Sequence, residues 1–430
     1  MQAGEGRVDI SPPVGITLGG FHYSPSKPRL ITGIRQPSMA RALVLRTGRQ
    51  MAAILSFDML NVSRDLARAV QRRVAKVTGI PARHVRVCAT HSHTMPTIAF
   101  NRQWGDVHPA YVARVEEALV SAAQRAMEDL ADAELSVGQA RTAGANFNRT
   151  TSKWKSDDVF TADSNDAERW LDTTLHVLFF GRAAPRKSLL WYNFSAHPVC
   201  HNDTLAGPDW PGLVEKLAVA EGLPAPAFLQ GHIGDVNPGH GDPWLGKVEP
   251  TAAAVVAAIR EAMAKAGRVS RPALRIEQRD ILLPLDMELF RAQIRSYHDD
   301  PSKCVAGEWV DAGFSKDWYE MFASRWDQRQ KNVPSSVAAM RLGDVGLVFH
   351  GSELYSVYGL MIRRDSPLPR TIVVGYSDGY VGYLPDPKAY EAREYAAVVV
   401  PKILNYPPFA RTAARELSEG ALRLLRKAAS

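Results

Sequence analysis

Residues 51–94, MAAILSFDMLNVSRDLARAVQRRVAKVTGIPARHVRVCATHSHT, decide the fold. Met51–Phe57 is a short apolar run that is typical of a buried strand, and His84–Ala89 is a second such run. Between them, apolar residues recur at helical spacing over Arg64–Val77, with Ser63 as the expected N-cap. A strand, a helix and a strand within about 40 residues form a βαβ unit, which implies a parallel pair of strands.

The rest of the chain continues this alternation of strands and helices. Further strands are expected at Glu134–Gly138, Leu175–Phe180, Ser188–Phe194, Leu274–Pro284, Val337–Leu342, Val345–His350 and Arg370–Gly375, and further helices at Ala110–Asp129, Pro211–Glu221 and Pro250–Ala266. We find no sequence repeat and no low-complexity linker. We therefore expect an α/β protein with a mixed, largely parallel sheet and flanking helices, built as a single domain over residues 1–430.

The segment 299–333 reads as an insertion into this domain, and it is rich in aromatic residues. These are Trp309, Phe314, Trp318, Tyr319, Phe322 and Trp326. Two interpretations are open: a helical pair that packs on the body of the protein, or a lid with an aromatic lining over a site.

Composition excludes several classes of protein. Hydrophobic residues make up 46% and charged residues 23% of the 430, which is the profile of an ordinary globular domain. The three cysteines lie far apart, so neither a disulfide framework nor a cysteine zinc cluster is indicated. The net charge of +7 is scattered, without a basic run or nucleic-acid motif. No apolar run reaches membrane-spanning length and the N-terminus does not resemble a signal peptide, so we expect a cytoplasmic protein.

Three polar clusters follow apolar strands, where ligands bind in open α/β sheets. Thr90–Thr94 contains His91 and His93, which project to the same side of an extended segment. Both imidazoles could bind zinc, or one could bind while the other acts as an acid or base. The other clusters are Trp191–Gly212, with His197 at the strand end, and Gln230–Gly241. Their joint occurrence favours a metal site at the carboxyl ends of the strands.

Two later motifs extend this pattern. His350-Gly351-Ser352-Glu353 follows a strand and is expected to open a helix, where Glu353 is either a metal ligand or a first-turn glutamate beside the helix dipole. The stretch Gly375–Tyr395 holds five tyrosines, most of which we interpret as core or surface aromatics.

Taken together and in order, the motifs resemble the catalytic domain of the neutral (alkaline, non-lysosomal) ceramidases. The matching stretches are GRVDISPP from Gly6, GIRQPSMARALVL with Arg35, SFD, THSH, ANFNRT, the strand-end His197, GDVNP, GSE and YVGYLPDPKAYEAREY. The resemblance runs over nearly the whole chain.

This resemblance implies a site as well as a fold. Carried over residue by residue, it makes His91, His197, Glu353 and Tyr383 the ligands of one zinc ion per chain. It places His93 beside the metal as a polar partner, Arg149 where it helps to polarise the scissile carbonyl, and Tyr395 in the active site. Asp58 and Asp209 are candidates for the groups that orient the ligating histidines.

The sequence departs from the family at one motif. The family carries a catalytic serine in GD-x-S-P, whereas Gly234-Asp235-Val236-Asn237-Pro238 has Asn237 at that position. An amide cannot be a serine-type nucleophile, although it can hydrogen-bond a developing oxyanion. We also expect the chain to lack the immunoglobulin-like C-terminal domain of secreted ceramidases, which favours a cytoplasmic relative with another substrate.

We therefore expect a zinc-dependent hydrolase that cleaves a linear amide bond of an N-acyl or lipid-like small molecule with zinc-activated water. His93, Arg149, Asn237 and Tyr395 are the expected catalytic residues. Two alternatives stay open: zinc-dependent acyl transfer, cyclisation or ester cleavage in small-molecule biosynthesis, and a non-catalytic binding protein on the same fold. Nucleic-acid partners are not expected.

Overall fold

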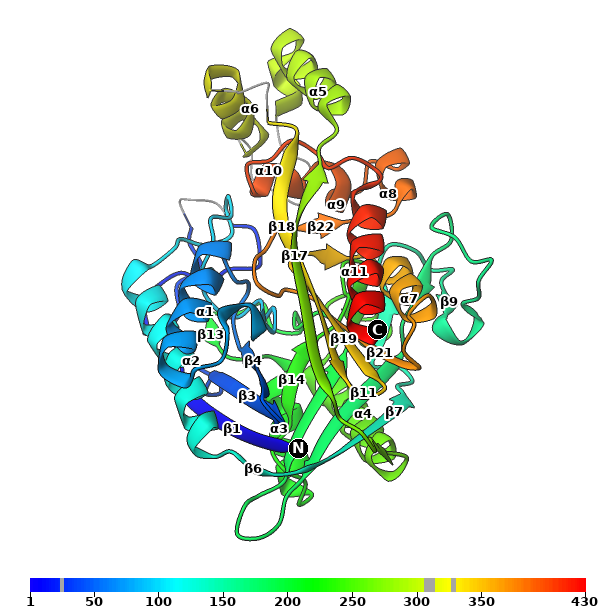
Figure 1. Cartoon of the computed structure of the whole chain (residues 1–430). Helices are drawn as coiled ribbons and strands as arrows, with labels where there is room; N and C mark the ends of the chain where they lie inside the picture. The colour runs from blue at the N-terminus through cyan, green and yellow to red at the C-terminus, as the bar shows by residue number, and fades with distance from the viewer. Residues whose placement is uncertain (24–26, 305–313, 326–329) are drawn as a thin grey trace.

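A computed structural model describes residues 1–23, 27–304, 314–325 and 330–430. These residues form three large mixed sheets (Figure 1). The first has the strand order β5 (Val85–Ala89), β4 (Gln50–Phe57), β3 (Met39–Thr47), β1 (Gln2–Asp9) and β6 (Ala131–Asp132). The second has the order β14 (Ala227–Gln230), β12 (Leu189–Phe194), β11 (Thr174–Gly181), β7 (Glu134–Arg141) and β16 (Gly267–Arg268). The third has the order β17 (Leu274–Pro284), β18 (Asn332–Leu342), β19 (Val345–His350) and β21 (Arg370–Val374).

The three sheets are built by the same chain path. In each, three strands pair antiparallel in succession, a helix crosses over, a fourth strand pairs parallel with the third, and a long helix follows later. The crossover helices are α1 (Arg64–Thr78), α3 (Trp210–Ala220) and α7 (Ser356–Arg364), and the later helices are α2 (Pro109–Glu128), α4 (Val248–Ala264) and α11 (Ala413–Ala429). The chain is therefore a structural threefold repeat, although its sequence shows none.

Hydrophobic burial explains the layered arrangement. The inner faces of the three sheets share one core, which includes Leu43, Trp191 and Leu347, one residue from each sheet. Each outer face is covered by its own two helices, so that α1 and α2 lie over the first sheet while α7 and α11 lie over the third (Figure 1). The α/β class with mixed sheets and flanking helices is thus confirmed. Parallel pairing between the large strands is confined to one pair per described sheet, because only the helical crossovers bring strands together in the same direction.

The first βαβ unit forms as the sequence predicts. The Ser63 side chain caps α1 by accepting a hydrogen bond from the Leu66 amide at 3.1 Å. Gly79 ends the helix with a φ of 75°, a left-handed conformation that glycine adopts without strain. β4 and β5 then pair parallel. His84 lies in a 3₁₀ turn just before β5 instead of in the strand.

The region between β17 and β18 projects from the body as two helices, α5 (Met287–Asp299) and α6 (Phe314–Arg325) (Figure 1). Phe290, Tyr297 and Trp318 form a small core between them. The pair is attached to the body by Lys402, which donates hydrogen bonds to Tyr297 and Ser315. The expected aromatic residues Trp309 and Trp326 lie outside the described residues. Among the residues that are described, no helix combines the length and apolar character needed to cross a bilayer.

Candidate metal centre

The polar loops that follow the parallel strands of all three sheets meet at one place. His91 and His93 follow β5, His197 follows β12, and Glu353 follows β19. All four side chains are buried. Because the carboxyl ends of parallel strands face the same edge, the repeated chain path aims these loops at a common point.

The donor atoms are spaced as a small metal ion requires. Nε2 of His91 lies 3.1 Å from Nε2 of His93 and 3.5 Å from Oε2 of Glu353. Nε2 of His197 lies 3.2 Å from the same Glu353 oxygen. A tetrahedral zinc ion with bonds of about 2.0–2.1 Å would hold its ligand atoms about 3.3 Å apart. The three histidines bring ligand atoms within 4.8 Å of one another and could hold a metal ion.

The protonation of the histidines also fits a metal. The Nδ1 atoms of His91 and His197 lie 2.6 Å and 2.7 Å from the backbone oxygens of Leu60 and Val236, so each Nδ1–H donates outward. This leaves both Nε2 lone pairs directed at the centre. Burial lowers the pKa of His197 to about 3, and burial with the neighbouring histidines holds the pKa of His93 well below its usual value. The imidazoles of His93 and His197 are therefore neutral, as metal ligation requires.

Glu353 is held by two tyrosines that the sequence did not single out. Tyr376 donates to its Oε2 at 3.0 Å and Tyr380 donates to its Oε1. Burial alone would raise the pKa of Glu353, but the nearby His91 and the hydrogen bond with His197 hold that pKa well below its usual value. The carboxylate is therefore ionised and can act as a metal ligand.

Tyr376 occupies the place in the third repeat that His91 occupies in the first. Each is the second residue after the fourth strand of its sheet, and each has a positive φ, 68° for His91 and 53° for Tyr376. The two rings stack with centroids 4.1 Å apart. Such backbone angles are uncommon for residues other than glycine and cluster at functional sites. The structural repeat is the signal that could have identified Tyr376.

Tyr383 is the backbone neighbour of Glu353. β20 (Glu353–Leu354) and β22 (Tyr383–Leu384) form a short parallel pair in which Glu353 faces Tyr383. The expectation that Glu353 opens a helix was therefore wrong. Glu353 pairs with Tyr383 in a short strand instead, and α7 begins only at Ser356. The Tyr383 hydroxyl accepts a hydrogen bond from Nη2 of Arg149 at 2.5 Å.

Arg149 links the tyrosine to the segment that carries Asn237. Its Nη2 also donates to the Gly234 carbonyl at 3.0 Å, and its Nη1 donates to Oδ1 of Asn237 at 3.1 Å. The Asn237 amide nitrogen donates in turn to the Trp244 carbonyl at 2.8 Å. Both ends of the Asn237 side chain are thus engaged within the protein.

Comparison with known proteins identifies the family. The model of the N-terminal region of neutral/alkaline non-lysosomal ceramidases matches residues 1–238, which is more than half of the chain. The chain belongs to the neutral/alkaline ceramidase family. Membership indicates an amide hydrolase of the ceramidase type.

Two solved ceramidase structures share the fold. Neutral ceramidase from Pseudomonas aeruginosa superposes with a TM-score of 0.73 at 16% identity, over 99% of this chain and 74% of that one. A ceramidase complexed with C2 gives a TM-score of 0.73 at 15% identity, over 99% of this chain and 75% of that one. No curated protein matches the chain. At these identities the structural likeness supports the fold alone.

In this ceramidase-family chain, Tyr395 lies beside Tyr383 with ring centroids 6.2 Å apart. Its hydroxyl is 3.0 Å from Nε2 of His22, whose ring also receives a hydrogen bond from Trp104. Neither His22 nor Trp104 belongs to a motif, so sequence reasoning could not place them here. The ring of Phe314 in α6 lies edge-on to the ring of His22, with centroids 5.9 Å apart, so the helical pair reaches the wall of the site.

The proposed orienting roles of Asp58 and Asp209 were wrong. Backbone carbonyls occupy the Nδ1 atoms of His91 and His197 instead. Asp58 accepts a hydrogen bond from the Met39 amide at 2.8 Å, and Asp209 caps α3. Both aspartates satisfy backbone donors that would otherwise be buried without partners.

Proposed function

We propose that the chain is a zinc-dependent hydrolase that cleaves the linear amide bond of an N-acyl compound. The observation that carries this proposal is the convergence of buried histidines and the ionised Glu353 at the carboxyl ends of three parallel strand pairs. Family membership supports the amide-hydrolase class. The choice of zinc rests on the mixture of nitrogen and oxygen donors.

The proposed ligands are His91, His197, Glu353 and Tyr383, with one zinc ion per chain. When bound there, zinc would lower the pKa of a coordinated water to about 7 and polarise a carbonyl group. Burial and the charge of Glu353 raise the pKa of Tyr383 above its usual value, and the adjacent Arg149 partly opposes them by favouring the ionised phenol.

The other side chains of the proposed site act on the carbonyl group and the amine of the substrate. Arg149 and Tyr395 supply hydrogen-bond donors for the scissile carbonyl oxygen as negative charge develops on it. The neutral His93 takes a proton from the attacking water and passes it to the departing amine when the C–N bond breaks, since its Nδ1 makes no bond to the described residues. Water supplies the oxygen of the carboxylic acid that is released.

Asn237 acts through Arg149 in this proposal. Its amide oxygen accepts from the guanidinium while its nitrogen is bound to the Trp244 carbonyl. A side chain with both ends occupied fixes the position of Arg149 instead of meeting the oxyanion itself. The expected direct catalytic role of Asn237 thereby becomes a positioning role.

The lack of a serine at position 237 also motivates the second candidate, in which a substrate amine or hydroxyl attacks in place of water. Product mass separates the two, since hydrolysis adds one water to the substrate mass and cyclisation does not. A protein that holds zinc and leaves every acyl substrate unchanged would instead be a binding protein.

The test combines metal analysis with a substrate screen. Elemental mass spectrometry of the wild type should find about one zinc per chain, and His197→Ala should lose it. His298→Ala is the matched control, because His298 is exposed on α5 and pairs with the adjacent Asp299. A wild type that takes up no zinc even when it is supplied would overturn the proposal. The single-domain organisation over residues 1–430 and the cytoplasmic location stay predictions.

A further inference from the structure

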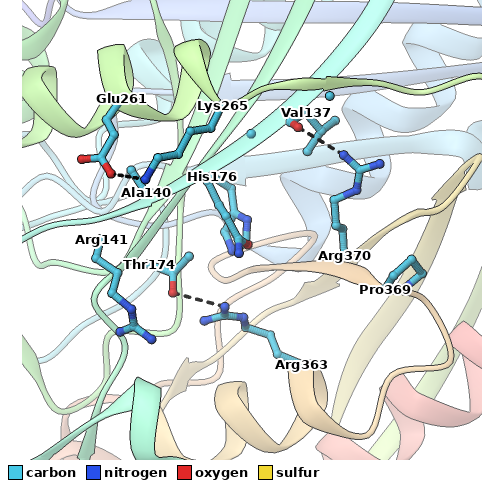
Figure 2. A pocket seen from close by; sticks show the side chains of 13 residues that line it. Val137, Ala140, Arg141, Thr174, His176, Glu261, Lys265, Arg363, Pro369 and Arg370 are labelled. Carbon is cyan, nitrogen blue, oxygen red and sulfur yellow. Dashed lines mark hydrogen bonds and ion pairs between the residues drawn. The ribbon is translucent and has the colours of Figure 1, made fainter.

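A pocket of about 650 Å³ lies at the seam between the second and third sheets (Figure 2). One wall comes from β7, β11 and the end of α4, and the other from α7 and the start of β21. None of the residues proposed to bind metal lines it. Its volume falls within the range of about 300–1,000 Å³ that small-molecule sites occupy.

Four cationic side chains line the pocket. Arg141, Arg363, Arg370 and Lys265 face the pocket, against the single carboxylate of Glu261. Glu261 pairs with Lys265 at 2.5 Å (Figure 2). Each arginine also pairs with a carboxylate outside the lining, Arg141 with Asp157, Arg363 with Asp172 and Arg370 with Asp344. These pairs offset much of the positive charge, so an anion would be held by the N–H donors that the pairs leave unused.

Two of these arginines have N–H groups that make no hydrogen bond to the described residues. A guanidinium has five N–H groups. Arg141 uses only Nη1, toward Asp157, Thr173 and Ser156, so its Nη2 and Nε make no bond to the described residues. Arg363 uses Nη1 toward Asp172 at 2.6 Å and Nη2 toward Thr174 at 3.2 Å, which leaves its Nε without a partner in the same part of the chain.

His176 is the second, independent indication of a ligand. It lies on the central strand β11, lines the pocket and is only 4% exposed, and Figure 2 shows it between Ala140 and Arg363. Neither of its ring nitrogens makes a hydrogen bond within the residues that the structure describes. Burial and the charge of Arg363 lower its pKa to about 3, so it is neutral and offers one N–H. Because neither ring nitrogen is sealed off from the pocket, its N–H can donate to a bound ligand.

We propose that this pocket binds a small organic anion, whose phosphate or carboxylate group is held by Arg141, Arg363 and His176. The cavity is larger than such a group alone, and Val137, Ala140 and Pro369 give its remaining wall an apolar surface for the rest of the ligand. Guanidinium groups suit both oxyanions, because their N–H donors match two oxygens at once. The proposal does not depend on the metal centre.

Calorimetric titration of the full chain with octyl phosphate and with octanoate tests the proposal and separates the two sources of the anion. At least one should bind at a single site with a Kd below about 1 mM, whereas neutral octanol should not. Arg141→Met and His176→Phe should each weaken binding by about 10-fold or more, since each removes a donor to a charged group. Arg260→Met is the matched control, because Arg260 is exposed on α4 outside the pocket.

A second arm excludes binding of the anion at the metal centre. His197→Ala should bind the probe as tightly as the wild type does. Loss of binding in His197→Ala, or unchanged binding in Arg141→Met, would overturn the proposal, as would the absence of saturable binding by either anion. Arg141 is chosen because its side chain is half exposed and its partner Asp157 keeps hydrogen bonds from Thr173 and Thr174, so the variant should fold.

Discussion

Two side chains, His93 and Tyr383, lie close enough to complete a metal site formed by His91, His197 and Glu353. We assign Tyr383 as the ligand and His93 as the acid, so Tyr383→Phe should weaken zinc binding by more than about 100-fold, beyond the loss of a group that only orients a ligand. His93→Ala should keep one zinc per chain and lose turnover. Zinc content after dialysis against a weak chelator measures both.

The opposite pattern, with zinc lost in His93→Ala and retained in Tyr383→Phe, would exchange the two roles. His298→Ala again serves as the control, because its side chain is exposed and remote from the cluster. The sequence left this choice open, since it showed only that His91 and His93 share a side of the chain. Because their Nε2 atoms are only 3.1 Å apart, zinc content of the two variants is needed to decide whether His93 is a ligand.

Asn237 and Arg149 should differ in how strongly they affect turnover. Arg149→Ala removes a donor to the developing oxyanion and should lower kcat by about 10²–10³-fold. Asn237→Ala only loosens the guanidinium and should lower kcat by about 10-fold with little change in KM. Steady-state kinetics on a hydrolysed N-acyl substrate measures both, with the exposed Asn165→Ala as control. An Asn237→Ala effect as large as that of Arg149→Ala would mean that Asn237 itself contacts the substrate.

At the scale of elements, the elements of residues 51–94 could be predicted because short apolar runs, a capping serine and a terminating glycine are local signals. The short strands of the site could not. β8 (Asn146–Asn148) pairs with β15 (Val236–Pro238) across almost 90 residues, and this pairing brings Arg149 to Asn237. Periodicity carries no information on two- or three-residue strands whose partner is distant in sequence.

Close packing of β1 on α2 gives a prediction at this scale. A Cβ added at Gly6 would overlap the Ala122 carbonyl oxygen in the helix, so Gly6→Ala should lower the free energy of unfolding by about 2–3 kcal/mol. At Gly420, inside α11, an added Cβ would meet only Arg423 at 3.8 Å and Ile281 at 3.9 Å. Gly420→Ala should therefore stabilise by about 0.5–1 kcal/mol. Urea denaturation measures the free energy of unfolding of both variants. Equal effects of Gly6→Ala and Gly420→Ala would contradict the close packing of β1 on α2.

For the whole molecule, buried neutral histidines make stability depend on pH. The pKa of His176 falls from its usual value near 6.5 to about 3 on burial, so the unfolded chain binds its proton first as pH decreases. Its contribution is complete above pH 6.5 and is lost below it, at about 1.4 kcal/mol per pH unit. Unfolding free energies between pH 7 and about 5 should therefore fall less steeply for His176→Leu than for the wild type. Parallel pH profiles would show that His176 is accessible to protons when folded.

The structural threefold repeat has no counterpart in the sequence. For this reason only part of the site could be predicted from the sequence. Strand-end motifs identified His91, His197 and Glu353 individually, but their convergence depends on three sheets sharing one core. The roles of Tyr376 and His22 could not be predicted, because their contacts with Glu353 and Tyr395 form only when the sheets pack together.

The same geometry predicts that the metal stabilises the entire chain. The proposed ligands come from loops of all three repeats, so a bound zinc ion connects the three sheets at one point. Zinc at about 1,000 times its Kd should add about 4 kcal/mol to the free energy of unfolding, which a strong chelator would remove. Thermal unfolding of the wild type should therefore shift downward with the chelator, whereas His197→Ala should not respond. A wild type that unfolds at the same temperature with and without the chelator would mean that no ion joins the repeats, and the buried histidines would then serve only to pack the loops together.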